Sequence, residues 1–194
     1  MVVIAAIVVI ALFVGLTYNR MVAKRQATEN SWSQIDVALR RRHDLIPTLV
    51  ESVKGYASHE RGTFESVTQA RSTAVADAAA APPERAAAEN TLKRATDRLL
   101  VVAEAYPELQ ATKNFTQLAD DLRTTEDQIQ ITRRVYNDTV ETYNTLIQVF
   151  PAVIVAKLFG FKRREFFDAP AGSEAAPAVD LSAAAPPPAA PGAA

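Results

Sequence analysis

The fold is decided by residues 114–150, NFTQLADDLRTTEDQIQITRRVYNDTVETYNTLIQVF, in which apolar or small side chains recur with a heptad period. One series consists of Phe115, Leu122, Ile129, Tyr136, Tyr143 and Phe150, and the other of Leu118, Thr125, Thr132, Thr139 and Leu146. This spacing places both series on one face of an α-helix. We therefore predict a single helix of roughly 54 Å, at about 1.5 Å per residue. Its expected N-cap is Asn114, with Gln117 as capping-box partner, and its expected end is Pro151.

A second long helix is predicted upstream, from Arg20 onward. Its face consists of Trp32, Ile35, Leu39, Arg42, Ile46, Leu49, Val53 and Tyr56, at alternating steps of three and four. Pro47 lies within this run. Because proline removes a backbone hydrogen bond, we expect either a bend there or the start of a new helix near Asp44.

Two shorter helices are predicted between the long ones, over residues 59–80 and 84–105. Pro82 and Pro83 separate them, and Pro107 ends the second. Short connections make consecutive helices pack antiparallel. The expected fold class is therefore all-α, an antiparallel up-and-down bundle (19–151) with long first and last helices. Four helices would form its distal half, and the two long helices alone would form a stem.

The N-terminus reads as a transmembrane anchor. Residues 2–16, VVIAAIVVIALFVGL, contain no polar side chain, and with their flanks they form an anchor over 1–18, within the roughly 17–25 residues that a span needs. A cleaved signal peptide is the alternative. It calls for a basic leading segment and small residues at a cleavage site, whereas Tyr18-Asn19-Arg20 follows here.

Basic residues follow the apolar run, among them Arg20, Lys24 and Arg25. The positive-inside rule then predicts a single-pass protein of the cell inner membrane, with its N-terminus outside and the bundle in the cytoplasm. The reverse orientation is the alternative.

Downstream of the bundle, residues 152–168 form an apolar and then basic membrane-proximal segment. Its candidate membrane contacts are Val153, Ile154, Leu158, Phe159, Phe161, Lys162, Arg163 and Arg164. The largely apolar run of residues 152–161 is too short to span a bilayer. The segment either lies in the membrane interface, with its cations at anionic headgroups, or folds back onto the stem. Residues 169–194 are almost entirely Ala and Pro, which predicts a disordered tail.

The amino-acid composition limits the kinds of chemical site that this chain can form. The 194 residues include no cysteine and two histidines, and the formal net charge is -1. Disulfides, thiolate nucleophiles and cysteine-based metal sites are therefore excluded, and a nucleic-acid surface is not indicated. His59-Glu60 is not a zinc-protease motif, because position 63 is Thr63. We expect no enzymatic activity, no cofactor, no metal and no small-molecule substrate.

Three charged residues, Arg42, Arg71 and Glu126, interrupt or border the apolar stripes. A buried charge is costly unless it is paired. Counting along two antiparallel helices from Tyr56 and Phe115 brings Arg42 level with Glu126, so we expect an interior ion pair that Asp44 or Glu104 joins. The functional alternative is an acid–base or metal site made of Arg42, His43, Asp44 and Glu60.

Two Tyr-Asn pairs, Tyr136-Asn137 and Tyr143-Asn144, lie one heptad apart on the same face. One interpretation is ordinary packing, with each phenol oxygen reaching water or a polar partner. The other interpretation considers the stem, where only two helices pack together and would leave these pairs and Trp32 exposed to solvent. A second copy or a protein partner would then cover them.

Several motifs resemble the LemA family over roughly residues 18–168. They are WSQID (32–36), RRHDLIP (41–47), VKGYASHE (53–60), EAYP (104–107), and AKLFGF (156–161). The resemblance implies a bacterial membrane protein with an N-terminal anchor and a helical bundle, and no established enzymatic activity or cofactor. Relatives include a protein linked to magnetosome membrane formation. Pro151-Ala152-Val153 departs from the more polar Pro-Ser-Asn that is usual in the family.

The sequence thus predicts a scaffold or interaction protein that organises the membrane or its partners through oligomerisation. Its expected partners are the lipid bilayer and either a second copy or another protein. An adaptor for a membrane protease or transport system is the alternative. A hydrolase is a weak third, because the sequence lacks a nucleophile elbow, a metal cluster and a glycine-rich loop.

Overall fold

The computed structural model describes residues 1–167, which form helices joined by turns and one extended segment and contain no strand. The elements are α1 (Val2–Lys54), α2 (Arg61–Ala76), a 3-10 turn (Asp77–Ala79), α3 (Pro82–Glu104), α4 (Pro107–Gln110), α5 (Lys113–Leu146) and α6 (Ala152–Leu158). The all-α prediction is confirmed. The expected disordered tail lies outside the described residues.

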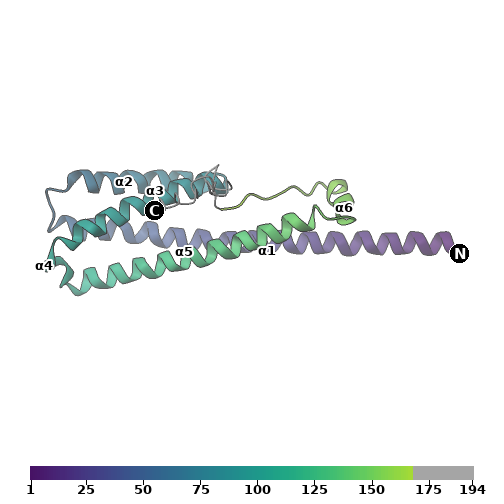
Figure 1. Ribbon diagram of the computed structural model, residues 1–194, viewed down its shortest axis with the longest axis horizontal. Helices are drawn as coiled ribbons and strands as arrows, with labels where there is room; N and C mark the ends of the chain where they lie inside the picture. The colour runs from purple at the N-terminus through teal and green to yellow at the C-terminus, as the bar shows by residue number, and fades with distance from the viewer. Residues whose placement is uncertain (168–194) are drawn as a thin grey trace, which may run out of the picture.

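The two long helices form the axis of the molecule (Figure 1). Ser31 contacts Thr139 through their hydroxyl oxygens at 2.9 Å, and Arg42 contacts Glu126 at 2.8 Å, so α1 and α5 run antiparallel. The hairpin of α2 and α3 packs on the distal half of this pair. The first residues of α1, 2–13, extend beyond the bundle with their side chains exposed.

Helix α1 continues through Pro47, so the predicted new helix near Asp44 is wrong. A proline at position 47 has no N–H to donate to the carbonyl of His43, one turn earlier. The Arg71 guanidinium of α2 donates its Nε–H to that carbonyl at 2.7 Å. Arg71 thus replaces the missing backbone donor, which explains why a charged residue lies in the stripe of α2.

Replacing Arg71 by alanine is expected to destabilise the fold by about 1–3 kcal/mol, because the His43 carbonyl loses this donor. In a Pro47→Ala background the new N–H at position 47 can bond that carbonyl, so the same Arg71→Ala change should cost less. Urea unfolding of the four proteins of this cycle, followed by circular dichroism in detergent, measures both costs. Equal costs in the two backgrounds would refute the assignment.

The N-cap of helix α5 lies two residues before the expected one. Thr112, in an extended conformation, is the N-cap, and its hydroxyl accepts a hydrogen bond from the Phe115 N–H at 3.4 Å. The predicted cap, Asn114, lies inside the helix. The helix ends at Leu146 rather than at Pro151, and a turn leads into α6.

Threonines take core positions where α1 meets α5. Thr125 and Thr132 are buried, and their hydroxyls donate to the carbonyls of Asp121 and Gln128, one turn earlier in α5. The small side chains let the two helices approach closely, and each of these hydroxyls has an acceptor within its own helix. Toward the distal half, where α2 and α3 join the long helices, leucines dominate the core, including Leu49, Leu92 and Leu99.

Candidate functional site

A buried ionic cluster joins three helices at mid-bundle. It contains Arg42 and His43 of α1, Glu89 of α3 and Glu126 of α5. Arg42 donates Nη1–H to Glu126 Oε1 at 2.8 Å and Nη2–H to the Glu89 carboxylate. His43 Nε2 lies 2.9 Å from Glu89 Oε1. Because Arg42, His43 and Glu89 are at most 6% exposed, this cluster fixes how the three helices meet.

The cluster contains the Arg42–Glu126 pair that the helix register predicts. Asp44 and Glu104 do not join it, and both are exposed. Consecutive residues of a helix lie about 100° apart, so with Arg42 and His43 turned inward Asp44 faces water. Glu89 was missed in the sequence, although it lies in phase with Leu92 and Leu99 on α3.

The ionisation of Glu89 reflects opposing forces. Burial raises its pKa, but the hydrogen bonds and electrostatic attraction that His43 and Arg42 provide together outweigh burial, so the pKa lies below its usual range. The cluster is therefore an ion network whose groups bind one another. The alternative acid–base or metal site is not assembled. Glu60 lies at the start of α2, beyond the end of α1, and that end is about three helical turns from Arg42.

A second buried cation, the guanidinium of Arg85, joins the start of α3 to α1. Arg85 is 1% exposed, donates to Asp36 Oδ1 at 2.6 Å, and places its guanidinium carbon 5.2 Å from the centre of the Trp32 ring. Asp36 also pairs with Arg40 at 2.6 Å. Arg85 was not predicted, although it lies four residues before Glu89 on the same face of α3.

The Tyr-Asn face binds an extended segment of the same chain, residues 160–167, here called the strap. The strap begins at Gly160, whose φ of 71° favours glycine, and it runs back along the stem (Figure 1). Asn144 makes two hydrogen bonds to the main chain of Arg164. Its Oδ1 accepts from the Arg164 N–H, and its Nδ2–H donates to the Arg164 carbonyl, each at 2.9 Å.

Three further side chains of α5 bind the strap through its main chain. Tyr143 donates to the carbonyl of Lys162 at 3.0 Å, Tyr136 donates to that of Glu165 at 2.9 Å, and Asn137 accepts from the Phe167 N–H at 2.9 Å. Burial raises the pKa of Tyr136 to about 12, which keeps this phenol protonated as a donor. The Phe167 ring ends the strap 5.6 Å from the ring of Trp32.

The expected open partner surface is therefore covered within one chain. Tyr136, Tyr143 and Asn144 are each at most 4% exposed, and Trp32 and Asn137 are half-buried. Of the two interpretations of this face, packing against polar partners is the one found in the described residues, because the strap supplies the third side of the two-helix stem. The hydrogen bonds from α5 go to main-chain atoms of the strap, which side-chain patterns in the sequence do not reveal.

The membrane-proximal segment divides into α6 and the strap. Ala152, Val155 and Ala156 of α6 pack in a cluster with Val14 and Met21 of α1. The next contact is aromatic, since the Phe161 ring lies 5.7 Å from that of Tyr18 and its face receives the Arg25 guanidinium at 5.7 Å. Arg164 pairs with Glu29 at 2.8 Å. Of the two alternatives for this segment, folding back is thus realised in residues 160–167.

Of the eight predicted membrane contacts, two are half-buried, Val153 and Phe161. The other six are exposed, namely Ile154, Leu158, Phe159, Lys162, Arg163 and Arg164.

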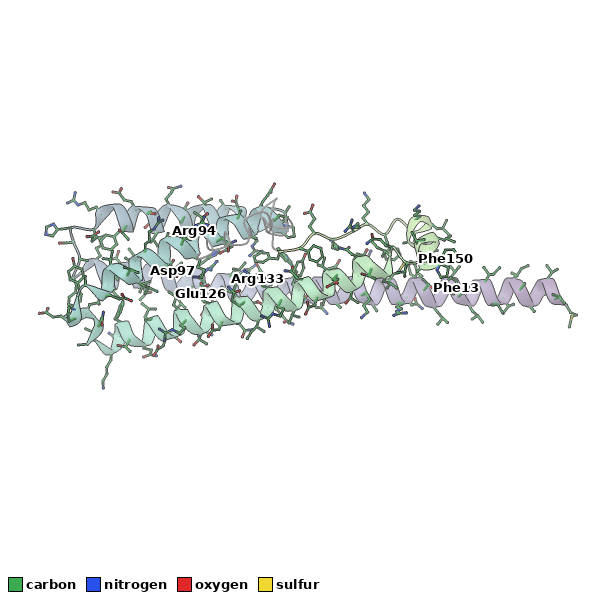
Figure 2. All side chains as sticks on the ribbon, in the orientation of Figure 1. Phe13, Arg94, Asp97, Glu126, Arg133 and Phe150 are labelled. Carbon is green, nitrogen blue, oxygen red and sulfur yellow. The ribbon has the colours of Figure 1, made fainter. Side chains whose placement is uncertain are left out.

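A groove of about 530 Å³ lies between α3 and α5. Its apolar lining includes Leu100, Phe115 and Leu122. Its charged lining consists of Asp97, Glu104, Asp120, Glu126 and Asp127 against Lys93 and Arg123. Figure 2 shows Asp97 on α3 and Glu126 on α5 at this part of the bundle. The groove is therefore acidic over an apolar floor, and Oε2 of Glu126 is buried there without a hydrogen-bond partner.

These features define an all-helical protein whose bundle continues directly from a helix that is long and apolar enough, by length and composition, to cross a membrane. The chain belongs to the LemA family, whose sequence profile matches residues 31–181.

Known relatives are consistent with this class. The chain is 28% identical to Magnetosome protein MamQ 2 of Paramagnetospirillum magneticum, over 81% of this chain and 67% of the relative. It is 26% identical to Magnetosome protein MamQ of Magnetospirillum gryphiswaldense, with the same coverage. It is 28% identical to Protein LemA of Metamycoplasma hominis, over 72% of this chain and 63% of the relative. Together with the apolar N-terminal helix, these relatives indicate membrane association.

Proposed function

We propose that this protein is a membrane-anchored scaffold that holds a rigid helical rod at a fixed place on the inner membrane and organises membrane or partners through oligomerisation. One observation carries the proposal: α1 is a single helix from Val2 to Lys54. The same helix supplies the apolar segment and the central helix of the bundle, so no flexible linker separates them. Its length is about 80 Å at 1.5 Å per residue.

The proposed role is not enzymatic. The titratable groups at mid-bundle, including His43 and Glu89, are buried and bind each other, so a substrate does not reach them. We further propose that the bundle lies in the cytoplasm, because Arg20, Lys24 and Arg25 follow the apolar run. Nucleic acids and small-molecule substrates are not among the proposed partners.

Cross-linking of the full-length protein in native membranes with an amine-reactive reagent tests the scaffold. We expect a ladder of adducts at multiples of the mass of the chain. A single adduct of constant size with another protein would replace the scaffold by the adaptor. Monomer alone at every reagent concentration would contradict both functions.

The groove between α3 and α5 favours the adaptor as the second candidate, because it could receive a partner's helix with basic flanks. A photoreactive side chain at Ala119, inside the groove, should then give the heterologous adduct. The same side chain at Val37, which is 69% exposed on α1, is the matched control and should not. Equal yields at both positions would contradict binding in the groove.

A further inference from the structure

Helix α6 is apolar except for Lys157, but protein covers only one side of it. Its inner residues, Ala152, Val155 and Ala156, are buried. On the outer side, Phe150 is 81% exposed, Ile154 59% and Leu158 72%, at successive spacings of four residues. Phe159 adds a ring that is 50% exposed. A helix with apolar side chains on both its inner and its outer side belongs in an apolar environment on both sides.

The position of α6 identifies the medium that covers its outer side. Its inner residues pack where the apolar run of α1 ends, between Val14 and Met21. The side chains of α1 at that level, such as Phe13 and Leu16, are themselves exposed and apolar. Figure 2 shows Phe13 and Phe150 at the same end of the bundle. A bilayer that surrounds residues 2–16 therefore reaches α6 as well.

Cations surround this apolar patch. Lys157 lies within α6, Lys162 and Arg163 follow it, and Arg20 lies at the end of the apolar run of α1; all four are exposed. Apolar side chains flanked by exposed lysines and arginines are the composition of segments that lie in the interface of an anionic bilayer.

We propose that Phe150, α6 and Phe159 form a foot that inserts into the headgroup region of an anionic bilayer beside α1. The foot is a second membrane contact, and it holds the rod at a fixed tilt that one transmembrane helix alone would not impose. This inference rests on the proposed anchoring of α1 in the membrane.

The experiment uses the absence of cysteine from the chain. Ile154→Cys and Leu158→Cys are made separately in the full-length protein, labelled with a nitroxide, and reconstituted in mixed phosphatidylcholine and phosphatidylglycerol vesicles. Ile7→Cys in the apolar run is the lipid reference, and Val101→Cys on α3, which is 63% exposed, is the water reference. The substituted side chains are all exposed, and circular dichroism verifies that each labelled protein keeps its helicity.

We expect labels at positions 154 and 158 to collide with dissolved oxygen more than with a water-soluble nickel complex, and to lie about 5–10 Å below the phosphates. Label 101 should behave oppositely. If labels 154 and 158 match label 101 while label 7 is in lipid, the foot is wrong and the anchor stands. If label 7 is also in water, the anchor itself is wrong. Spin–spin broadening at 154 without contact with lipid would show that a second copy covers the patch, which also overturns the proposal.

Discussion

Glu89→Ala is expected to lower the free energy of unfolding by about 3–5 kcal/mol, because it leaves Arg42 and His43 buried without their shared carboxylate. For a chain of this size, that loss lowers the melting temperature by on the order of 10 °C. Thermal unfolding of the full-length protein in detergent, followed by circular dichroism, measures it.

Two matched changes show whether burial is the cause. Glu126→Gln should cost less, because its side chain is 21% exposed and Arg42 keeps Glu89. Asp97→Ala removes the carboxylate of a surface pair with Lys93, whose side chains are 39% and 52% exposed, and should cost roughly 0–1 kcal/mol. If all three variants have the same melting temperature, the cluster does not stabilise the bundle.

The pH dependence supplies a second readout with a defined sign. The pKa of Glu89 is lowered in the folded protein, so its ionised form stabilises the fold fully above the unfolded-state value of about 4.3. That contribution is lost as the pH falls through the folded-state pKa. The stability gap between wild type and Glu89→Ala should therefore be widest near neutrality and shrink in acid. A gap independent of pH would contradict the assignment of charge.

Asn144→Ala is expected to release the strap. The buried Asn144 amide makes both hydrogen bonds to the main chain of Arg164, and at about 1 kcal/mol each their loss is roughly 2 kcal/mol. An open strap should then be populated roughly 30-fold more, since about 1.4 kcal/mol corresponds to a factor of ten. Trypsin cleavage after Lys162, Arg163 and Arg164 should accelerate by a similar factor, because proteolysis follows the open population.

Asn137→Ala is the graded control, because Asn137 makes one bond to the strap rather than two, and cleavage should rise by a smaller factor. Asn30→Ala, on the exposed surface of α1, should leave cleavage unchanged. Equal cleavage in wild type and Asn144→Ala would mean that the strap is held by contacts other than this amide.

The sequence by itself determined the four longest helices, their antiparallel order and the Arg42–Glu126 pair. Each of these follows from local periodicity or from counting residues along two helices of fixed rise. The apolar N-terminal segment was likewise readable, because membrane-spanning ability depends on composition and length. The sequence also predicted that Tyr136 and Tyr143 share one face of α5, but it did not predict that the strap covers this face.

Tertiary structure alone decided which polar residues meet. Glu89 and Arg85 are in phase with the apolar stripe of α3, but whether such a residue faces the core or water depends on the rotation of α3 against α1. Arg71 reaches a carbonyl freed by Pro47, and the strap covers the Tyr-Asn face through main-chain hydrogen bonds. The contacts of Arg71 and of the strap join segments distant in the sequence. They involve backbone atoms, which every residue has, so no pattern of side chains specifies them in advance.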